Sequence, residues 1–233
     1  MSWRAIAGRL FPEGHAIVQT GDMLDGVGVC GATTFAVTGT ADHAEVGVEA
    51  CLAMARAVLE CVRGHPGRPI LFMIDTQGQR LRRRDEMLGL QRYMGHLATC
   101  VEVARMRRHP LLGLVYDQAL SGGILPSAMC ADACGALPDA EIRVMNLAAM
   151  ARVTHIDLQR LRDLALSSPA FAPGVRHFAQ MGAVDGIWDG DLAQALLAAL
   201  ATADPQDRRA ERGLARDGRL HAFNVAERVA HDG

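Results

Sequence analysis

Hydrophobic residues follow two spacings along this chain, one typical of helices and one typical of buried strands. Residues 46–63 (VGVEACLAMARAVLECVR) place apolar side chains three and four positions apart, which predicts a helix that ends before Pro66. The same period returns over residues 85–107. Unbroken apolar runs at residues 70–75 (ILFMID) and 111–116 (LLGLVY) predict strands buried on both faces. The order of strand, loop and helix, repeated, is typical of an α/β fold.

The segment before the first of these helices predicts a β-meander. Residues 16–40 are rich in Val, Thr and Gly, with turn signals at residues 21–22 and 25–26. The glycines of this segment match the dinucleotide-binding pattern G-x-G-x-x-G at Gly26, Gly28 and Gly31. A strand-like run follows them, whereas pyrophosphate binding requires a helix there. We therefore interpret these glycines as turn residues of the meander.

Shorter signals continue after residue 140. They predict a strand at 141–146, helices near 157–166 and 173–181, a short strand within 184–188 and a helix near 190–202. After Asp204-Pro205 the composition changes to charged residues of both signs. We expect one domain over residues 1–203 and a charged helix or tail over residues 204–233.

Composition narrows the class of protein. The chain has 233 residues, of which 50% are hydrophobic, and this is enough for one well-buried domain. The formal net charge of -2 does not favour binding to nucleic acid or to an anionic membrane. No apolar run approaches the roughly 20 residues that span a bilayer, and the N-terminus lacks the features of a signal peptide. These features predict a cytoplasmic protein.

The cysteines predict core thiols and no metal site. They are Cys30, Cys51, Cys61, Cys100, Cys130 and Cys134, and most lie in apolar stretches without C-x-x-C spacing. Cys130 and Cys134 could face one side of a helix as metal ligands, but no further Cys or His pair lies nearby in sequence to complete four-coordination.

The stretch DQALSGGILPSAM, residues 117–129, is the first candidate site. A strand that ends at Tyr116, followed by Gly122 and Gly123 at the start of a helix, would present free N–H groups to an anion or oxyanion. Pro126 fits the first turn of such a helix.

Two alternatives remain for this stretch. Ser121 could be a nucleophile, although the G-x-S-x-G pattern fails because Ala119 occupies the first glycine position. The two glycines could instead serve close packing of helix and strand.

A second strand-to-helix loop, Thr76-Gln77-Gly78, follows the run at 70–75, and two such loops at the carboxyl ends of neighbouring strands should converge. The succession ILFMIDTQGQ, LLGLVYDQALSGGI, EIRVMN and FAQMGAVDGIWD resembles the carboxyltransferase branch of the crotonase superfamily. It is most similar to the gamma subunit family of biotin-independent malonate decarboxylases. The resemblance covers residues 15–200 and implies a single α/β domain with the crotonase-like ββα superhelix (ClpP/crotonase fold).

The resemblance also implies a function. A gamma subunit shares its active site with a homologous beta subunit, and together they decarboxylate a malonyl thioester on an acyl carrier protein to the acetyl thioester and CO2. The carrier supplies the phosphopantetheine-type arm, an acyl-transferase alpha subunit completes the enzyme, and the gamma chain itself binds no cofactor. By position, the oxyanion site corresponds to Ser121, Gly122 and Gly123, and the substrate loop to Thr76, Gln77 and Gly78.

Two departures from the biotin-dependent relatives agree with a biotin-independent enzyme. Gln77 stands where those relatives have the proline of D-T-P-G, and residues 146–149 (Asn-Leu-Ala-Ala) stand where they have S-P-E-G. Decarboxylation of a malonyl thioester requires little more from the protein than backbone amide donors. Loss of CO2 leaves an enolate, whose charge is best stabilised by preorganised donors.

Positive charge is expected to frame the site. One run comprises Arg80, Arg82, Arg83 and Arg84; a second comprises Arg105, Arg107 and Arg108. These arginines could dock the acidic carrier protein, contact the partner subunit or form a solvated surface.

Two other functions remain open from the sequence. A self-sufficient hydratase or isomerase would need a carboxylate over the acyl chain, and the loops offer Asp75 and Asp117, for which capping at strand ends is a sufficient explanation. A non-catalytic scaffold subunit would have no need of free amides at Gly122 and Gly123.

Overall fold

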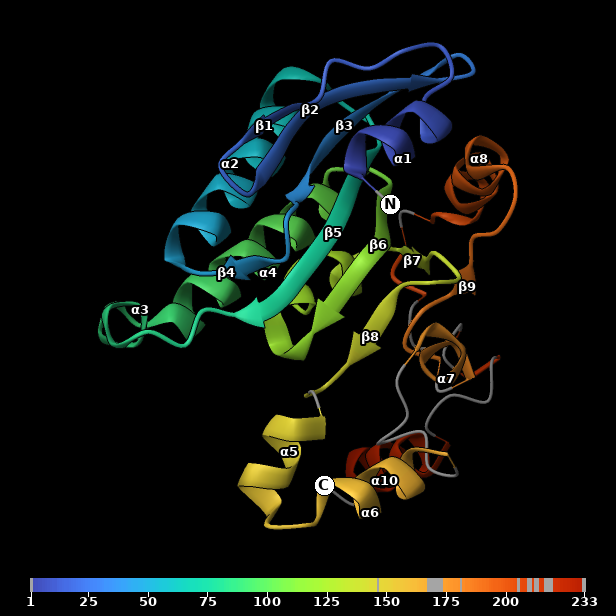
Figure 1. Cartoon of the computed structure of the whole chain (residues 1–233). Helices are drawn as coiled ribbons and strands as arrows, with labels where there is room; N and C mark the ends of the chain where they lie inside the picture. Colours follow the sequence, from blue (N-terminus) through green and yellow to red (C-terminus); the bar gives the residue numbers. More distant parts are fainter. Residues whose placement is uncertain are drawn as a thin grey trace.

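A nine-stranded, mostly parallel sheet forms the centre of the protein (Figure 1). This computed structural model describes residues 2–145, 147–166, 174–180, 182–204, 206–208, 211, 214–215 and 220–231, with the backbone alone for residues 149 and 180. The strands are β1 (Val18–Thr20), β2 (Met23–Cys30), β3 (Thr33–Thr40), β4 (Ala44–Val46), β5 (Ile70–Gln79), β6 (Leu111–Leu120), β7 (Ala133–Ala136), β8 (Glu141–Arg143) and β9 (Gly186–Ile187).

The helices precede, follow and connect these strands. They are α1 (Trp3–Leu10), α2 (Val48–Gly64), α3 (Arg83–Leu88), α4 (Leu90–Met106), α5 (Leu147–Thr154), α6 (Leu158–Ala165), α7 (Val175–Gln180), α8 (Leu192–Thr202) and α10 (Leu220–His231). Two short 3₁₀ helices, η1 (Ser121–Ile124) and η2 (Ala128–Cys130), follow β6.

The strand order is β1-β2-β3-β5-β6-β7-β9, with β4 added beside β5 and β8 beside β6. Strands β1 to β3 are antiparallel, which confirms the predicted meander, and the pairs from β3 onward are parallel. The predicted turn at residues 25–26 is wrong, because both residues lie inside β2. Gly28 also lies within β2, where the ring of Phe11 packs so closely that an added Cβ would be 2.4 Å from it.

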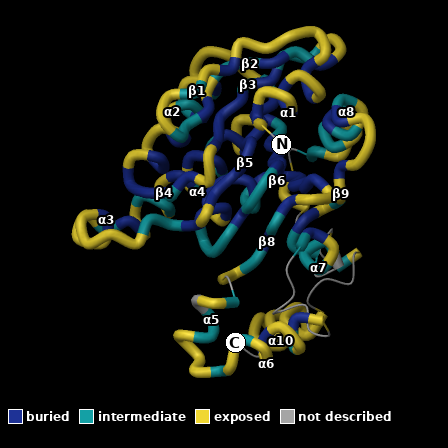
Figure 2. Tube along the Cα trace, viewed as in Figure 1, coloured by how far each residue is buried: buried dark blue, intermediate teal, exposed yellow. Residues whose placement is uncertain are grey.

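The two apolar runs form the middle of the sheet, as predicted. Helices α2 and α4 pack against each other behind it, and α1 lies across the opposite face near α8 (Figure 1). Every residue of β5 from Ile70 to Thr76 is buried, because helices cover both faces (Figure 2). All six cysteines are free and five are buried, in agreement with reduced core thiols.

Three predicted boundaries differ from the structure. The helix expected over residues 85–107 is interrupted at Gly89, whose left-handed φ of 78° separates α3 from α4. Strands β5 and β6 each run on for several residues beyond the apolar run, because β4 and β8 supply backbone partners there. No α-helix begins directly after β6: the chain forms the 3₁₀ turn η1 there instead, and Pro126 lies in the turn after it.

Helices α5, α6 and α10 lie beyond the end of β8, apart from the sheet (Figure 1). They are largely exposed, and α10 has no buried residue (Figure 2). Helix α10 falls in the segment predicted to be a charged helix or tail, while the proposed boundary at residue 204 stays a prediction. Among the described residues, no helix combines the length and apolar character that a membrane crossing requires.

Candidate active site

The turn η1, here called the glycine turn, lies at the carboxyl end of β6 beside the end of β5. Ser121 opens it in a left-handed conformation, with φ 54°. The N–H of Gly122 donates to the side-chain oxygen Oε1 of Gln79 at 2.9 Å. The Gly122 amide is therefore already directed at an oxygen acceptor.

Gly123 has a different reason to be glycine. It is buried, and an added Cβ would lie 2.9 Å from the carbonyl carbon of Gly78 and 3.0 Å from Oγ1 of Thr76. A Cβ added at Gly78, whose φ is 113°, would likewise lie 3.0 Å from the Leu120 carbonyl oxygen and 3.0 Å from Cβ of Ser121. The two predicted segments therefore converge, and close packing accounts for Gly123, as the alternative interpretation held.

The predicted substrate loop, Thr76 to Gln79, continues β5 and is not a separate loop, which corrects the prediction. Thr76 is fully buried; its hydroxyl donates to the Ala44 carbonyl at 2.6 Å and accepts from the N–H of Gly78 at 3.0 Å. Gly78 is buried as well, whereas Gln77 is exposed. Of the three predicted substrate-binding residues, Gln77 is the one whose side chain faces solvent.

Ser121 has no catalytic partner of the expected kind among the described residues. Within the described part of the chain, no hydrogen bond joins its hydroxyl to a histidine. The interpretation of Ser121 as a nucleophile gains no support from this geometry.

The first arginine run forms ion pairs with β4 and with the start of α2. Arg82 pairs with Glu45 at 2.7 Å and Arg84 with Glu49 at 2.5 Å, while Arg80 reaches both glutamates. In addition, the buried carboxylate of Asp85 accepts the N–H of Val48 at 3.1 Å. Much of the positive charge of this run is thus balanced within the chain.

Arg83 is the member of this run that is exposed and has no ion pair within the described residues. If the run docks an acidic carrier, Arg83→Glu should raise KM for the carrier-bound substrate by about 2- to 5-fold, in a salt-dependent way. A small thioester analogue and the Arg107→Glu variant serve as controls. An unchanged KM for the carrier-bound substrate would show that this arginine does not contribute to docking.

The second arginine run does not frame the glycine turn. It precedes β6, so it lies at the amino end of a strand whose carboxyl end carries the turn. Arg105 is buried, pairs with buried Asp132 at 2.7 Å through Nε, and also bonds Glu102 and the Cys130 carbonyl. The expected role of Arg105 at the site is wrong, because its buried ion pair and hydrogen bonds stabilise the fold.

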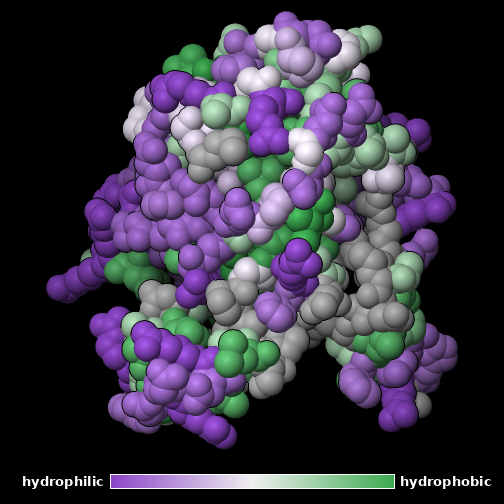
Figure 3. Space-filling view, turned by 45° about the vertical axis from the view of Figure 1, so that its right-hand side comes forward, coloured by the Kyte–Doolittle hydropathy of each residue, from purple (hydrophilic) through white to green (hydrophobic). Residues whose placement is uncertain are grey.

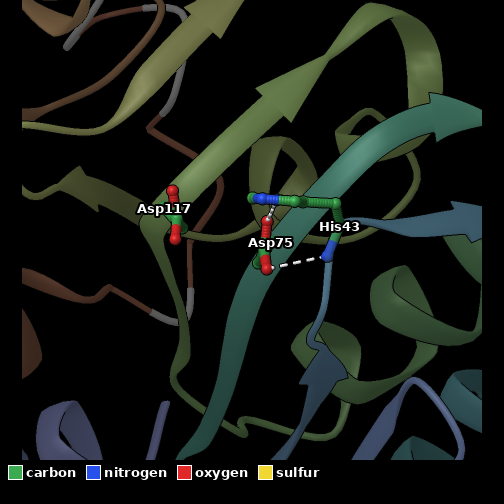
Figure 4. Close-up of side chains that lie close together, drawn as sticks. All are labelled: His43, Asp75 and Asp117. Atoms are coloured by element: carbon green, nitrogen blue, oxygen red, sulfur yellow. Dashed lines mark hydrogen bonds and ion pairs between the residues drawn. The ribbon is translucent and has the colours of Figure 1, made fainter. Parts of the chain in front are cut away.

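Sequence reasoning missed His43, which the loop before β4 brings to the carboxyl-terminal half of β5. Its Nδ1 lies 2.7 Å from Oδ1 of Asp75, and its backbone N–H donates to Oδ2 of the same carboxylate at 2.9 Å. Figure 4 shows the imidazole lying across Asp75, with Asp117 beyond it on β6. Asp75 and Asp117 lie inside strands, so the strand-end capping expected for them is wrong.

These three side chains line a hollow of about 570 Å³, together with residues of α1 that include Trp3 and Arg4. They offer one nitrogen and two oxygen atoms within 4.8 Å of one another, a set that could ligate a divalent cation. Buried Tyr116 lies in the same wall; burial, followed by the charge of Asp75, raises the pKa of its hydroxyl above the ordinary value. The described residues that line the hollow include none of the glycine turn, so the two sites are separate.

Comparison with known proteins supplies the family. The malonate decarboxylase gamma subunit profile matches residues 41–232. The chain belongs to this family. The match extends past residue 204, so the family's sequence pattern includes the segment around α10.

A curated relative from Malonomonas rubra, malonyl-S-ACP:biotin-protein carboxyltransferase, is 31% identical over 149 residues. The match includes 60% of this chain and 51% of the relative, so the chain spans about half the length of that protein.

Solved structures confirm the crotonase-like fold. A Pseudomonas malonate decarboxylase hetero-tetramer in complex with coenzyme A has a TM-score of 0.81 and 23% identity, covering 100% of this chain and 99% of the other. A Pseudomonas malonate decarboxylase hetero-dimer gives 0.78 at 24% identity, over 98% and 97% of the two chains. Transcarboxylase 12S gives 0.70 at 19% identity and covers 86% of this chain, but 42% of its own. The predicted carboxyltransferase-type fold and the family resemblance are both confirmed.

Proposed function

We propose that this gamma subunit supplies one half of a shared active site that decarboxylates a malonyl thioester to the acetyl thioester and CO2. Its contribution is the glycine turn, with the N–H of Gly122 as an oxyanion donor. The observation that carries the proposal is the 2.9 Å hydrogen bond from this N–H to the oxygen of Gln79, because it shows the amide directed at an oxygen outside its own turn. Such preorganised donors stabilise the enolate that CO2 loss leaves behind.

The glycine turn is weaker than an α-helix N-terminus as an anion site. Hydrogen bonds in a 3₁₀ turn reach back only three residues, so fewer N–H groups stay available than the sequence predicted. We therefore assign the donor role mainly to Gly122. Gly123 instead allows the close packing that fixes the turn against β5. A second set of donors would come from the homologous beta subunit.

Exposed apolar side chains support a partner subunit. The lobe beyond β8 exposes Val153, Leu166, Leu220, Phe223, Val225 and Val229. Figure 3 shows hydrophobic patches among hydrophilic ones on the lower part of the molecule. Large exposed apolar patches are typical of protein interfaces. The solved Pseudomonas relatives are a hetero-dimer and hetero-tetramers, and we propose a beta subunit as the partner here.

The thioester arm would come from a carrier protein. In this proposal the phosphopantetheine-type arm of an acyl carrier protein brings the malonyl group, an alpha subunit loads that carrier, and the gamma chain holds no cofactor of its own. The direct test is CO2 release from malonyl carrier protein by the gamma and beta chains together. Failure of the assembled pair to release CO2 would contradict the proposal.

A second function has a specific observation in its favour. The Malonomonas rubra relative is named for carboxyl transfer from a malonyl carrier protein to a biotin protein, so this chain could belong to a transferase. Gln77 replaces the proline expected in biotin-dependent relatives and argues against it. Avidin added to the CO2 assay separates the two functions, because it should block only a biotin-dependent reaction.

A further inference from the structure

The side chain of Gln79 accepts a hydrogen bond from the same amide that the proposed mechanism assigns to the substrate oxygen. Its Oε1 accepts from Gly122 N–H at 2.9 Å, in a partly buried setting. A Cβ added at Gly122 would lie 3.2 Å from this oxygen, so the acceptor approaches on the side where glycine leaves space. A carboxamide oxygen is an sp² acceptor, like the oxygen of a thioester or carboxylate.

The backbone of Gln79 is held by the pairing of β5 with β4, and its side chain by the hydrogen bond from Gly122. Gln79 is the last residue of β5 and pairs with Val46 of β4. The next N–H, that of Arg80, donates to the Val46 carbonyl at 2.9 Å. Gly78 holds the strand against Leu120 and Ser121. Rotation of the half-buried Gln79 side chain alone would therefore free the Gly122 amide, without any movement of the sheet.

We propose that the Gln79 carboxamide is a displaceable internal ligand, whose oxygen holds the Gly122 amide until a substrate oxygen replaces it. Gln79 thereby sets the affinity for the malonyl thioester as a positioning residue. This inference rests on the proposed function, because it takes the Gly122 amide as the oxygen-binding group. It implies that one hydrogen bond within the protein is broken each time the enzyme binds substrate.

A static clamp is the competing explanation. If Gln79 only stiffens the glycine turn, any acceptor at position 79 should serve and its loss should lower kcat. A displaceable ligand makes the opposite prediction, since removal of the competing acceptor should tighten substrate binding with little change in kcat. The variants Gln79→Met, of similar length but without the amide acceptor, and Gln79→Glu, with a charged acceptor, separate the two.

The experiment measures kcat and KM for CO2 release by the assembled gamma and beta complex. For Gln79→Met we expect KM to fall by about 2- to 10-fold, as for loss of one neutral hydrogen bond. For Gln79→Glu we expect KM to rise by about 10-fold, because the carboxylate binds the amide more strongly and repels the malonyl carboxylate. Gln79→Ala should follow Gln79→Met.

A Gln79→Glu complex with wild-type kinetics, or a Gln79→Met complex with lower kcat and unchanged KM, would overturn the inference in favour of the clamp. If Gln79→Glu does not assemble, the Met and Ala variants decide by the direction of KM. A wild-type complex that releases no CO2 would overturn the proposed function and this inference with it. CO2 release with clamp-like variants would overturn this inference alone.

Discussion

Gly122→Ala should lower kcat for CO2 release, by at most the roughly 100- to 1,000-fold that is typical for loss of one whole oxyanion donor. The backbone of Gly122 does not have a left-handed φ, so alanine can adopt it. Its Cβ would nevertheless point at the acceptor position, 3.2 Å from the oxygen of Gln79. That side chain can rotate away, whereas a substrate oxygen bonded to the amide would have to shift by a few tenths of an ångström and lose part of this hydrogen bond. We therefore expect a folded complex with reduced activity.

Ser121→Gly is the matched control for this variant. Glycine accepts the φ of 54° at position 121 without strain and removes the hydroxyl. Most activity should remain if the turn acts through its backbone, while a nucleophilic serine would make this variant inactive. Gly123→Val is not a useful probe, because its side chain would collide with Gly78 and Thr76 whatever the chemistry. A Gly122→Ala complex with wild-type activity, or an inactive Ser121→Gly complex, would contradict the oxyanion role of the turn.

Arg105→Met should destabilise the chain by about 3 to 5 kcal/mol, as expected when one partner of a buried ion pair is removed. Arg105 and Asp132 are both buried, and the second oxygen of Asp132 accepts the N–H of Leu111 at 2.8 Å. Without the guanidinium, a carboxylate charge would remain buried next to the start of β6. Urea unfolding of the gamma chain, with its midpoint and slope, measures the loss.

A double variant checks the physical cause of this loss. Arg105→Met combined with Asp132→Asn removes both charges and should cost clearly less than the sum of the two single variants. Additive losses would show that the pair is not energetically coupled. Arg107→Met, at an exposed position of the same arginine run, should change stability by less than about 0.5 kcal/mol.

The sequence predicted elements whose pattern is local. The apolar runs at 70–75 and 111–116 became the middle strands, and the period of three and four gave α2, because burial against the sheet selects for it. The continuation of β5 through Thr76 and Gly78 could not be read in this way. It depends on pairing with β4, a strand that α2 separates from β5 in the sequence.

The site was predictable only in outline, for the same reason. The end of β5 and the glycine turn converge as expected, yet the contact that matters, Gln79 with Gly122, joins residues 43 positions apart. His43 meets Asp75 through a similar long-range return of the chain, and no local pattern marks it. The charge pattern was misleading at Arg105. A run of arginines does not show which of its members is buried beside a carboxylate partner.

The most direct test of the shared-site account is to measure CO2 release from malonyl carrier protein by the gamma chain alone, the beta chain alone and the two combined. The account predicts that neither chain alone is active and that mixing restores activity together with a stable complex. Full activity of the gamma chain alone, shown to be monomeric in the assay, would contradict it. The account would also be contradicted if the beta chain alone were as active as the assembled complex.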